Sequence, residues 1–231
     1  MMSVSDVDDL EVWKKVRALE QSIAGPANYV IGPSFTASIN EDPKHLLFTL
    51  ARYKFAAKML GEGKSLDVIE VGCSEGLGTM ILAQAAAKVV GIDSDQAAIT
   101  WARRYATEQM SFECRDFRTE AVDGLFDAAV SIDVLEHVSS QFEREFVANL
   151  CRHLNPSGFC IVGTPNLAAS AHASALSAAG HINLFDAARL VHLFGDFFHN
   201  VFLFGMNDEV LHTGFAPMCH YLFVLCCNKK V

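Results

Sequence analysis

The sequence predicts an α/β protein in which helices cover a doubly wound, mostly parallel sheet. The first observation is a short apolar run at 66–71, which leads into a glycine-rich turn and then an alanine-rich helical stretch. The second is the alternation of strand-like and helix-like segments that follows. The third is a pair of late strand-like runs with no long helix between them, which predicts an antiparallel hairpin at the sheet edge.

The alternation defines the individual elements. Strands of the parallel part are expected at 66–71, 88–92, 111–114, 126–132 and 159–163. Helices are expected at 77–87, 95–106, 141–154 and 187–194. Ser140 and Glu143 fit a capping box at the start of the third of these helices. The runs 197–204 and 220–227 complete a sheet of seven strands.

The first 62 residues are expected to form a helical cap on this core. Residues 3–24 fit a short helix, and residues 25–41 look irregular because glycine–proline pairs occur at 25–26 and 32–33. Asp42 and Pro43 are typical of a helix start, and Gly61 is typical of a helix end. We therefore expect one domain over 1–231, with a cap at 1–62 and a Rossmann-like core at 63–231.

Composition limits the class of protein and its surroundings. With 51% hydrophobic and 19% charged residues, the 231-residue chain is globular, and its net charge of −9 disfavours a nucleic-acid partner. No apolar run approaches the roughly 18 residues of a membrane span. Seven scattered cysteines without a CxxC pair predict neither disulfides nor a metal site. A cytoplasmic monomer or homodimer is expected.

The turn after the first strand indicates the kind of ligand. Gly72 and Gly76 let the backbone approach a ligand closely, and the next helix offers free N–H groups. Glu70 lies at the strand end just before, where a carboxylate disfavours a pyrophosphate and favours a cationic ligand. The spacing also differs from the Gly-x-Gly-x-x-Gly loop of NAD-dependent oxidoreductases, which form the rival enzyme class.

Further motifs follow at successive strand ends. Asp93 lies about 20 residues beyond the loop, where an acid commonly binds ribose hydroxyls. Cys114-Arg115-Asp116-Phe117 lies at the end of the third strand, and the run 131–138, Ser-Ile-Asp-Val-Leu-Glu-His-Val, lies at the end of the fourth. The turn 154–159 precedes the fifth. With the first loop, these motifs make residues 45–227 resemble the class I S-adenosylmethionine-dependent methyltransferases, although Ser74 replaces the middle glycine of that family's acid-x-Gly-x-Gly-x-Gly motif.

The resemblance implies S-adenosylmethionine as cofactor and S-adenosylhomocysteine as product. Glu70 and Asp133 are then expected to complement the cofactor's ammonium group, and Asp116 to contact the adenine amino group with Phe117 on the ring. Arg52, on the helix after Pro43, is a candidate for the cofactor carboxylate, with solvation as its alternative. The full predicted cofactor set is Arg52, Glu70, Gly72, Cys73, Ser74, Gly76, Asp93, Ser94, Asp116, Phe117, Asp133 and Val134.

Two histidines are candidates for a general base, because their ordinary pKa lies near neutrality. His181 follows the alanine- and serine-rich stretch 167–180, which is expected to act as a lid or substrate loop or, alternatively, to be a short surface helix. His137 belongs to the fourth motif, where it equally fits a residue that orients the loop. A base is needed only if the acceptor is a hydroxyl or a protonated amine.

The acceptor is expected to be a small polar molecule. The segments 48–55, 180–184 and 206–209 resemble methyltransferases of bacterial surface-polysaccharide genes, which implies a hydroxyl of a sugar, nucleotide-sugar or glycan precursor. A quinone or other phenol is the alternative acceptor. A non-catalytic cofactor-binding protein is the alternative of another class, because Ser74 interrupts the loop motif and the sequence contains no obvious base.

Overall fold

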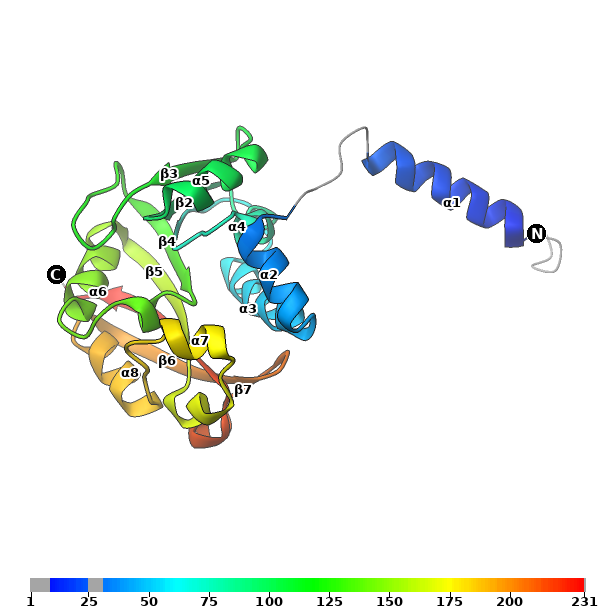
Figure 1. Cartoon of the computed structure of the whole chain (residues 1–231). Coiled ribbons are helices and arrows are strands. Elements are labelled where there is room, and N and C mark those ends of the chain that lie inside the picture. Colours follow the sequence, from blue (N-terminus) through cyan, green and yellow to red (C-terminus); the bar gives the residue numbers. More distant parts are fainter. Residues whose placement is uncertain (1–8, 25–30, 231) are drawn as a thin grey trace, which may run out of the picture. The chain divides into compact units, whose positions relative to one another are not determined.

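Figure 1 shows the chain as a computed structural model, which describes residues 9–24 and 31–230. Contacts divide the chain into two units, Met1–Ile31 and Gly32–Val231. The first contains the helix α1 (Asp9–Ala24), in agreement with the predicted helix; the beginning of that prediction, at 3–8, lies outside the described residues. The part of the predicted irregular stretch at 25–30 also lies outside them.

The second unit is built on one sheet, which confirms the predicted α/β class. Its order is β3-β2-β1-β4-β5-β8-β6-β7, with parallel pairing from β3 to β5 and antiparallel pairing beyond. The described residues contain eight strands rather than the predicted seven, because a three-residue strand extends the last hairpin. The strands are β1 (Asp67–Val71), β2 (Lys88–Asp93), β3 (Met110–Cys114), β4 (Phe126–Ile132), β5 (Leu154–Pro165), β6 (Phe198–Asn207), β7 (Val210–His212) and β8 (Tyr221–Lys229).

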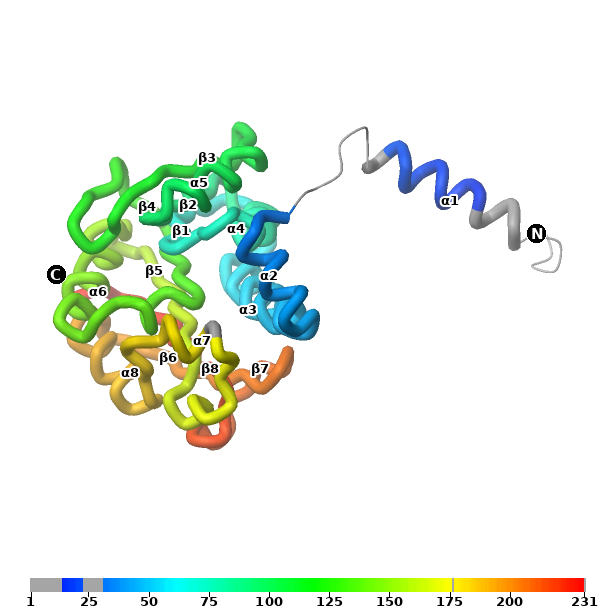
Figure 2. The backbone as a smooth tube through the Cα atoms, in the orientation of Figure 1, coloured from blue at the N-terminus to red at the C-terminus, as the bar shows by residue number. Residues whose placement is uncertain are grey.

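Helices cover both faces of the sheet, as Figure 2 shows. Alternate residues of β1 point to opposite sides, so Val68 packs with α3 and α4 while Ile69 packs with α6 and α8. Both side chains are fully buried. The helices of this unit are α2 (Pro33–Glu41), α3 (Lys44–Leu60), α4 (Leu77–Leu82), α5 (Gln96–Ala102), α6 (Glu143–Arg152), α7 (Ala175–Gly180) and α8 (Ala187–Gly195), with short 3₁₀ turns at 103–105, 135–137, 167–172 and 216–218.

Two local expectations are wrong. Residues 33–41 form α2 rather than an irregular stretch, since Pro33 occupies the first helical turn and its ring suits that position. The expected capping box at Ser140 and Glu143 is absent: Phe142 precedes α6 without a side-chain cap, and Glu143 instead binds Asn183 and Arg189. Among the described residues, none of the helices has both the length and the apolar character needed to cross a membrane.

Candidate functional site

Most of the predicted site residues lie at the carboxyl ends of three neighbouring strands. β1 lies between β2 and β4. The connection after β1 packs on one face of the sheet through Leu82 of α4, whereas the connection after β4 packs on the other face through Leu135. Such a switch in strand order opens a crevice in which open α/β sheets bind their ligands. The glycine loop, Asp93 and the 133–137 turn all begin there, at the ends of β1, β2 and β4.

The loop after β1 is fastened to β2. The backbone N–H groups of Gly72 and Cys73 both donate to the Ile92 carbonyl, at 2.8 and 3.0 Å. The Ser74 N–H donates to Asp93 Oδ2 at 2.8 Å, and Ser74 adopts a left-handed conformation with φ of 47°. Gly72 also has a positive φ, and a Cβ on it would lie 2.1 Å from a Val134 methyl group. Glycine is therefore required where the β1 and β4 loops touch.

Glu70 supplies a buried carboxyl group to this crevice. Its side chain is 1% exposed and accepts a hydrogen bond from the Thr79 hydroxyl. Its second oxygen, Oε1, has no hydrogen-bond partner in the part of the chain that the structure describes. Burial raises the pKa of Glu70 to about 7, against the opposing effect of the Thr79 and Tyr53 hydroxyls. An orphaned carboxylate oxygen in a dry site favours a cationic partner.

Arg52 and Asp133, both predicted to bind the cofactor, contact each other. Arg52 Nη1 lies 2.9 Å from Asp133 Oδ1 and 2.7 Å from Oδ2. The guanidinium also stacks on the Tyr221 ring, 4.0 Å from its centroid. The Tyr221 oxygen in turn accepts the Asp133 N–H at 3.2 Å, which supports the left-handed backbone of Asp133 at φ of 58°. α3 is thus joined to the β4 turn across the crevice.

The other residues predicted to bind the cofactor differ in burial and in the partners that they contact. Ser94 is exposed beside Asp93, and Cys73 is buried against Gly91. Asp116 binds the Arg118 guanidinium through both oxygens, which lowers the pKa of that carboxyl. Phe117 lies within the main core, 5.9 Å from the Phe146 ring and 5.2 Å from the His153 ring by centroids. Core packing therefore accounts for its burial without any cofactor.

The two predicted bases lie side by side. The rings of His137 and His181 are 5.2 Å apart by centroids, and burial followed by the neighbouring His137 lowers the pKa of His181. Glu136 completes the group, with ligand atoms of all three side chains within 4.8 Å of one another. Glu136 was not predicted as a site residue, although its position beside His137 in the motif after the fourth predicted strand is a signal of that kind.

Glu75 is a second residue that sequence reasoning missed. Its carboxylate accepts the N–H groups of Ser34 and Phe35, at 2.9 and 3.2 Å, and is 3% exposed. It thereby binds the first turn of α2 to the glycine loop. The only signal in the sequence was an acid inside that loop, with no indication of its partner.

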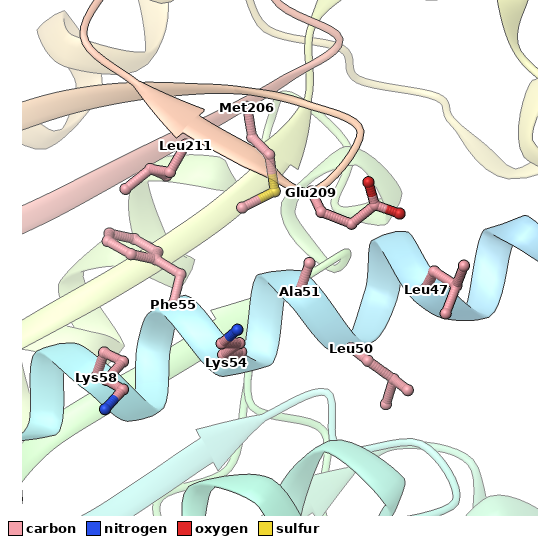
Figure 3. Close-up of a pocket in the computed structure, with 9 residues that line it drawn as sticks. All are labelled: Leu47, Leu50, Ala51, Lys54, Phe55, Lys58, Met206, Glu209 and Leu211. Atoms are coloured by element: carbon pink, nitrogen blue, oxygen red, sulfur yellow. The ribbon is translucent and has the colours of Figure 1, made fainter.

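Two cavities flank α3, away from the crevice. One of about 410 Å³ separates α3 from β6 and β7 (Figure 3), where Phe55 faces Met206 and Leu211 and where Lys54 and Glu209 add charges. The other, of about 610 Å³, lies between α3 and α4. Neither is lined by any of the predicted site residues, so the switch-point crevice remains the candidate site.

Residues 68–158 match the family model described as "Methyltransferase domain". A ubiquinone biosynthesis O-methyltransferase of Rickettsia akari is 32% identical over 120 residues, which cover 51% of this chain and 47% of the relative. A probable S-adenosylmethionine-dependent methyltransferase of Mycolicibacterium smegmatis is 35% identical over 101 residues, covering 43% of this chain and 38% of the relative. The chain thus spans less than half the length of these curated relatives.

Solved structures share the fold. The N-methyltransferase NodS of Bradyrhizobium japonicum, solved with S-adenosylhomocysteine, aligns with a TM-score of 0.59 at 19% identity, over 93% of this chain and 98% of that chain. A putative methyltransferase in complex with the Haloferax volcanii Trm112 activator aligns with a TM-score of 0.65 at 13% identity, over 87% and 100%.

The match over residues 68–158 and the shared fold make the chain similar to the class I S-adenosylmethionine-dependent methyltransferases. The cofactor of this class is S-adenosylmethionine, and its charges suit the residues present. Its ammonium and sulfonium cations match the orphaned Glu70 oxygen and the Asp133 carboxylate. Its carboxylate matches Arg52, whose Nε also has no hydrogen-bond partner within the described ranges.

Proposed function

We propose that the domain transfers a methyl group from S-adenosylmethionine to a hydroxyl oxygen of a small acceptor. The observation that carries this proposal is the buried Glu70, whose free oxygen faces no protein cation at the switch point of the described sheet. A dinucleotide would place phosphate charge at this loop, where a carboxylate repels it. A methyl donor with two cationic groups is attracted instead.

Each of the site residues then has a binding or positioning role. Glu70 and Asp133 hold the ammonium group, Arg52 binds the carboxylate and Asp93 accepts the ribose hydroxyls. In-line transfer needs the donor methyl and the acceptor oxygen aligned, so this positioning lowers the barrier. The acceptor's proton is expected to leave toward His181 first and His137 second. The lowered pKa of His181 supports this order, since it keeps the imidazole neutral at pH 7.

A phenolic acceptor is favoured over the sugar hydroxyl that the sequence analysis put first. Several curated relatives carry the name ubiquinone biosynthesis O-methyltransferase. In addition, three apolar side chains are exposed on the connections that follow β5 and precede β8. They are Leu167, Phe215 and Met218, with between 46% and 73% of their surface exposed. Exposed apolar groups on these connections suit an aromatic ring better than a glycan.

A direct turnover assay tests the proposal. The purified chain is incubated with S-adenosylmethionine and either dihydroxybenzoates or nucleotide sugars, and mass spectrometry measures S-adenosylhomocysteine and the methylated acceptor. We expect turnover with the dihydroxybenzoates. Turnover confined to nucleotide sugars would overturn the phenolic assignment, and binding of the cofactor without turnover on either set would favour a non-catalytic protein.

Matched glycine variants control the assay. Gly72→Ala adds a methyl group that collides with Val134 at a positive φ, so it should abolish cofactor binding. Gly124→Ala also places alanine at a positive φ, of 97°, but meets no atom within 4 Å. It carries the same kind of backbone strain away from the site and should retain activity.

A further inference from the structure

We propose that Glu136, His137 and His181 form a binding site for one divalent cation of the manganese-to-zinc series. The three side chains present ligand atoms within 4.8 Å of one another, a span that a single ion can bridge after small side-chain adjustments. Two imidazoles and one carboxylate form a mixed nitrogen and oxygen donor set. Such sets suit Mn²⁺, Fe²⁺, Co²⁺ and Zn²⁺ better than Mg²⁺ or Ca²⁺, which prefer oxygen alone.

The carboxylate is in an unusual position for a group with no ligand. Glu136 is fully buried, and its Oε2 accepts the Thr164 hydroxyl at 3.1 Å. Its Oε1 has no hydrogen-bond partner among the residues that the structure describes. A buried, unsatisfied carboxylate oxygen costs free energy unless something binds it. A cation held beside the two histidines meets that requirement.

His137 is oriented as metal-binding histidines are. Its Nδ1 lies 2.8 Å from the Gly180 carbonyl oxygen, which can only accept a hydrogen bond, so Nδ1 carries the proton. With Nδ1 as the donor, Nε2 is the ring nitrogen that can offer its lone pair to a ligand. A backbone carbonyl that fixes the ring and its tautomer is the usual second partner of a metal-bound histidine.

The two segments that supply the ligands are fastened together by the backbone. The N–H groups of Ile182 and Asn183 both donate to the Glu136 carbonyl oxygen at 3.0 Å. The Asn183 side chain donates to the Val138 carbonyl at 2.9 Å, and its oxygen accepts the Arg189 guanidinium at 2.8 Å. His181 is thus held beside Glu136 by bonds on its carboxyl-terminal side, which gives the site a preformed geometry.

The local charge favours a cation. Arg52 lies near enough to interact with both Glu136 and His181, but both of its contacts at Nη1 go to Asp133. The Arg52 and Asp133 charges therefore offset each other. In its deprotonated form Glu136 carries one negative charge, which a divalent cation offsets. With both imidazoles bound to it, the cation rather than a histidine would bind the acceptor hydroxyl and lower its pKa, a role that rests on the proposed function.

Manganese binding tests the site without any need for catalysis. The full chain is treated with a chelator, dialysed and titrated with Mn²⁺, and the loss of the free-ion electron paramagnetic resonance signal measures binding. Mn²⁺ has little affinity for the seven free cysteines, which would confuse a zinc titration. We expect one equivalent per chain, and at least tenfold weaker binding in His137→Ala and in His181→Ala. His192→Ala, which removes an exposed histidine from α8, should bind as the wild type does.

Absence of saturable binding in the wild type, or equal binding by wild type, His137→Ala and His181→Ala, would overturn the proposal and leave the histidines as a proton-accepting pair. His137 is exposed, so its replacement should not disturb folding, and circular dichroism checks this. Glu136→Gln preserves the side-chain shape and should weaken binding as well. S-adenosylhomocysteine affinity, measured on the same samples, separates failure of the metal site from failure of the cofactor site.

Discussion

The burial of Glu70 lowers the stability of the free protein and suits the binding of a cationic cofactor. A carboxyl group with 1% exposure and one unpartnered oxygen in the described structure would not be selected for stability, because burial disfavours its charged form. The raised pKa, to about 7, expresses that cost. A cationic cofactor would reverse it by pairing with the carboxylate. On the proposed function, the residue would couple the protonation of the free protein to binding of the donor.

The first prediction concerns the pH dependence of stability. The pKa of Glu70 rises from 4.5 in the unfolded chain to about 7 in the folded one, so the folded state binds more protons between these values. Glu70 therefore adds up to about 3 kcal/mol to the free energy of unfolding below pH 4.5, and this contribution is lost as the pH rises to 7. In the Glu70→Gln variant, the free energy of unfolding should therefore decrease less with rising pH than in the wild type. Urea unfolding at pH 5, 6, 7 and 8 measures this.

Some pH dependence will remain in the Glu70→Gln variant. Glu136 is also buried with a raised pKa, of about 8, and changes stability in the same direction over an overlapping range. The test is therefore the difference between wild type and variant. An unchanged slope between pH 5 and 7 would show that Glu70 is ionised in the folded protein throughout.

The second prediction concerns Arg52. Its assignment to the cofactor carboxylate predicts that Arg52→Gln weakens S-adenosylhomocysteine binding about 10- to 100-fold, the loss expected for a charged hydrogen bond of 1.5–3 kcal/mol. 5′-Methylthioadenosine has the same nucleoside but no amino-acid group, so its affinity should hardly change. Calorimetric titration of both ligands measures this. Arg104→Gln, which removes an exposed arginine stacked on Trp101, is the matched control, and equal losses for both ligands would contradict the assignment.

At the scale of elements, α2 depends on an acid that lies far along the chain. Glu75 accepts two N–H groups of the first turn of α2, and those groups have no partner within the helix. A charged acceptor at this end also suits the helix dipole. These two hydrogen bonds therefore link the glycine loop to α2.

The third prediction follows from this link. Glu75→Gln keeps one acceptor but removes the charge, and it should destabilise α2 by about 1 kcal/mol, the usual value of a helix cap. Hydrogen exchange of the amides at 34–41 should accelerate about fivefold, with little change in the sheet. Glu41→Gln, at the other end of α2, is the control. Equal exchange in the wild type and the Glu75→Gln variant would show that the cap contributes nothing.

Elements were predictable from the sequence where local pattern decides them. β1, β2 and β4 are apolar runs with clear turn residues, and their observed limits fall within one residue of those expected. α2 was missed because Gly32-Pro33 marks a helix start as readily as a loop. The Ser140 capping box failed for a tertiary reason, since Glu143 is engaged by Arg189 and Asn183.

The site was predictable only in part, because some of its contacts depend on tertiary packing and not on local sequence pattern. The glycine loop and Asp93 follow from local spacing and strand ends. The contact between Glu136 and His181 depends on how the 180–183 segment folds back onto the 135–137 turn, which no local pattern encodes. The pairing of Arg52 with Asp133 likewise requires α3 to lie across the end of β4.

At the scale of the whole molecule, the crevice draws on elements from both faces of the sheet. Arg52 comes from α3, whose helix packs on one face, whereas Asp133 precedes a turn whose Leu135 packs with the core on the other. Tyr221, at the start of β8 near the end of the chain, holds both. A ligand bound between them therefore joins parts that are distant in sequence and must stabilise the second unit as a whole.

The last prediction measures this stabilisation. A ligand that binds only the folded state adds RT ln(1 + [L]/Kd), which is about 2.7 kcal/mol at a hundredfold excess over Kd. For a unit of this size, the midpoint of thermal unfolding should rise by about 5–10 °C with S-adenosylhomocysteine. NAD⁺ at the same concentration should leave it unchanged, because its pyrophosphate meets Glu70. A shift with NAD⁺ and none with S-adenosylhomocysteine would mean that the crevice binds a dinucleotide and that the carboxylate at the end of β1 is neutral in the complex.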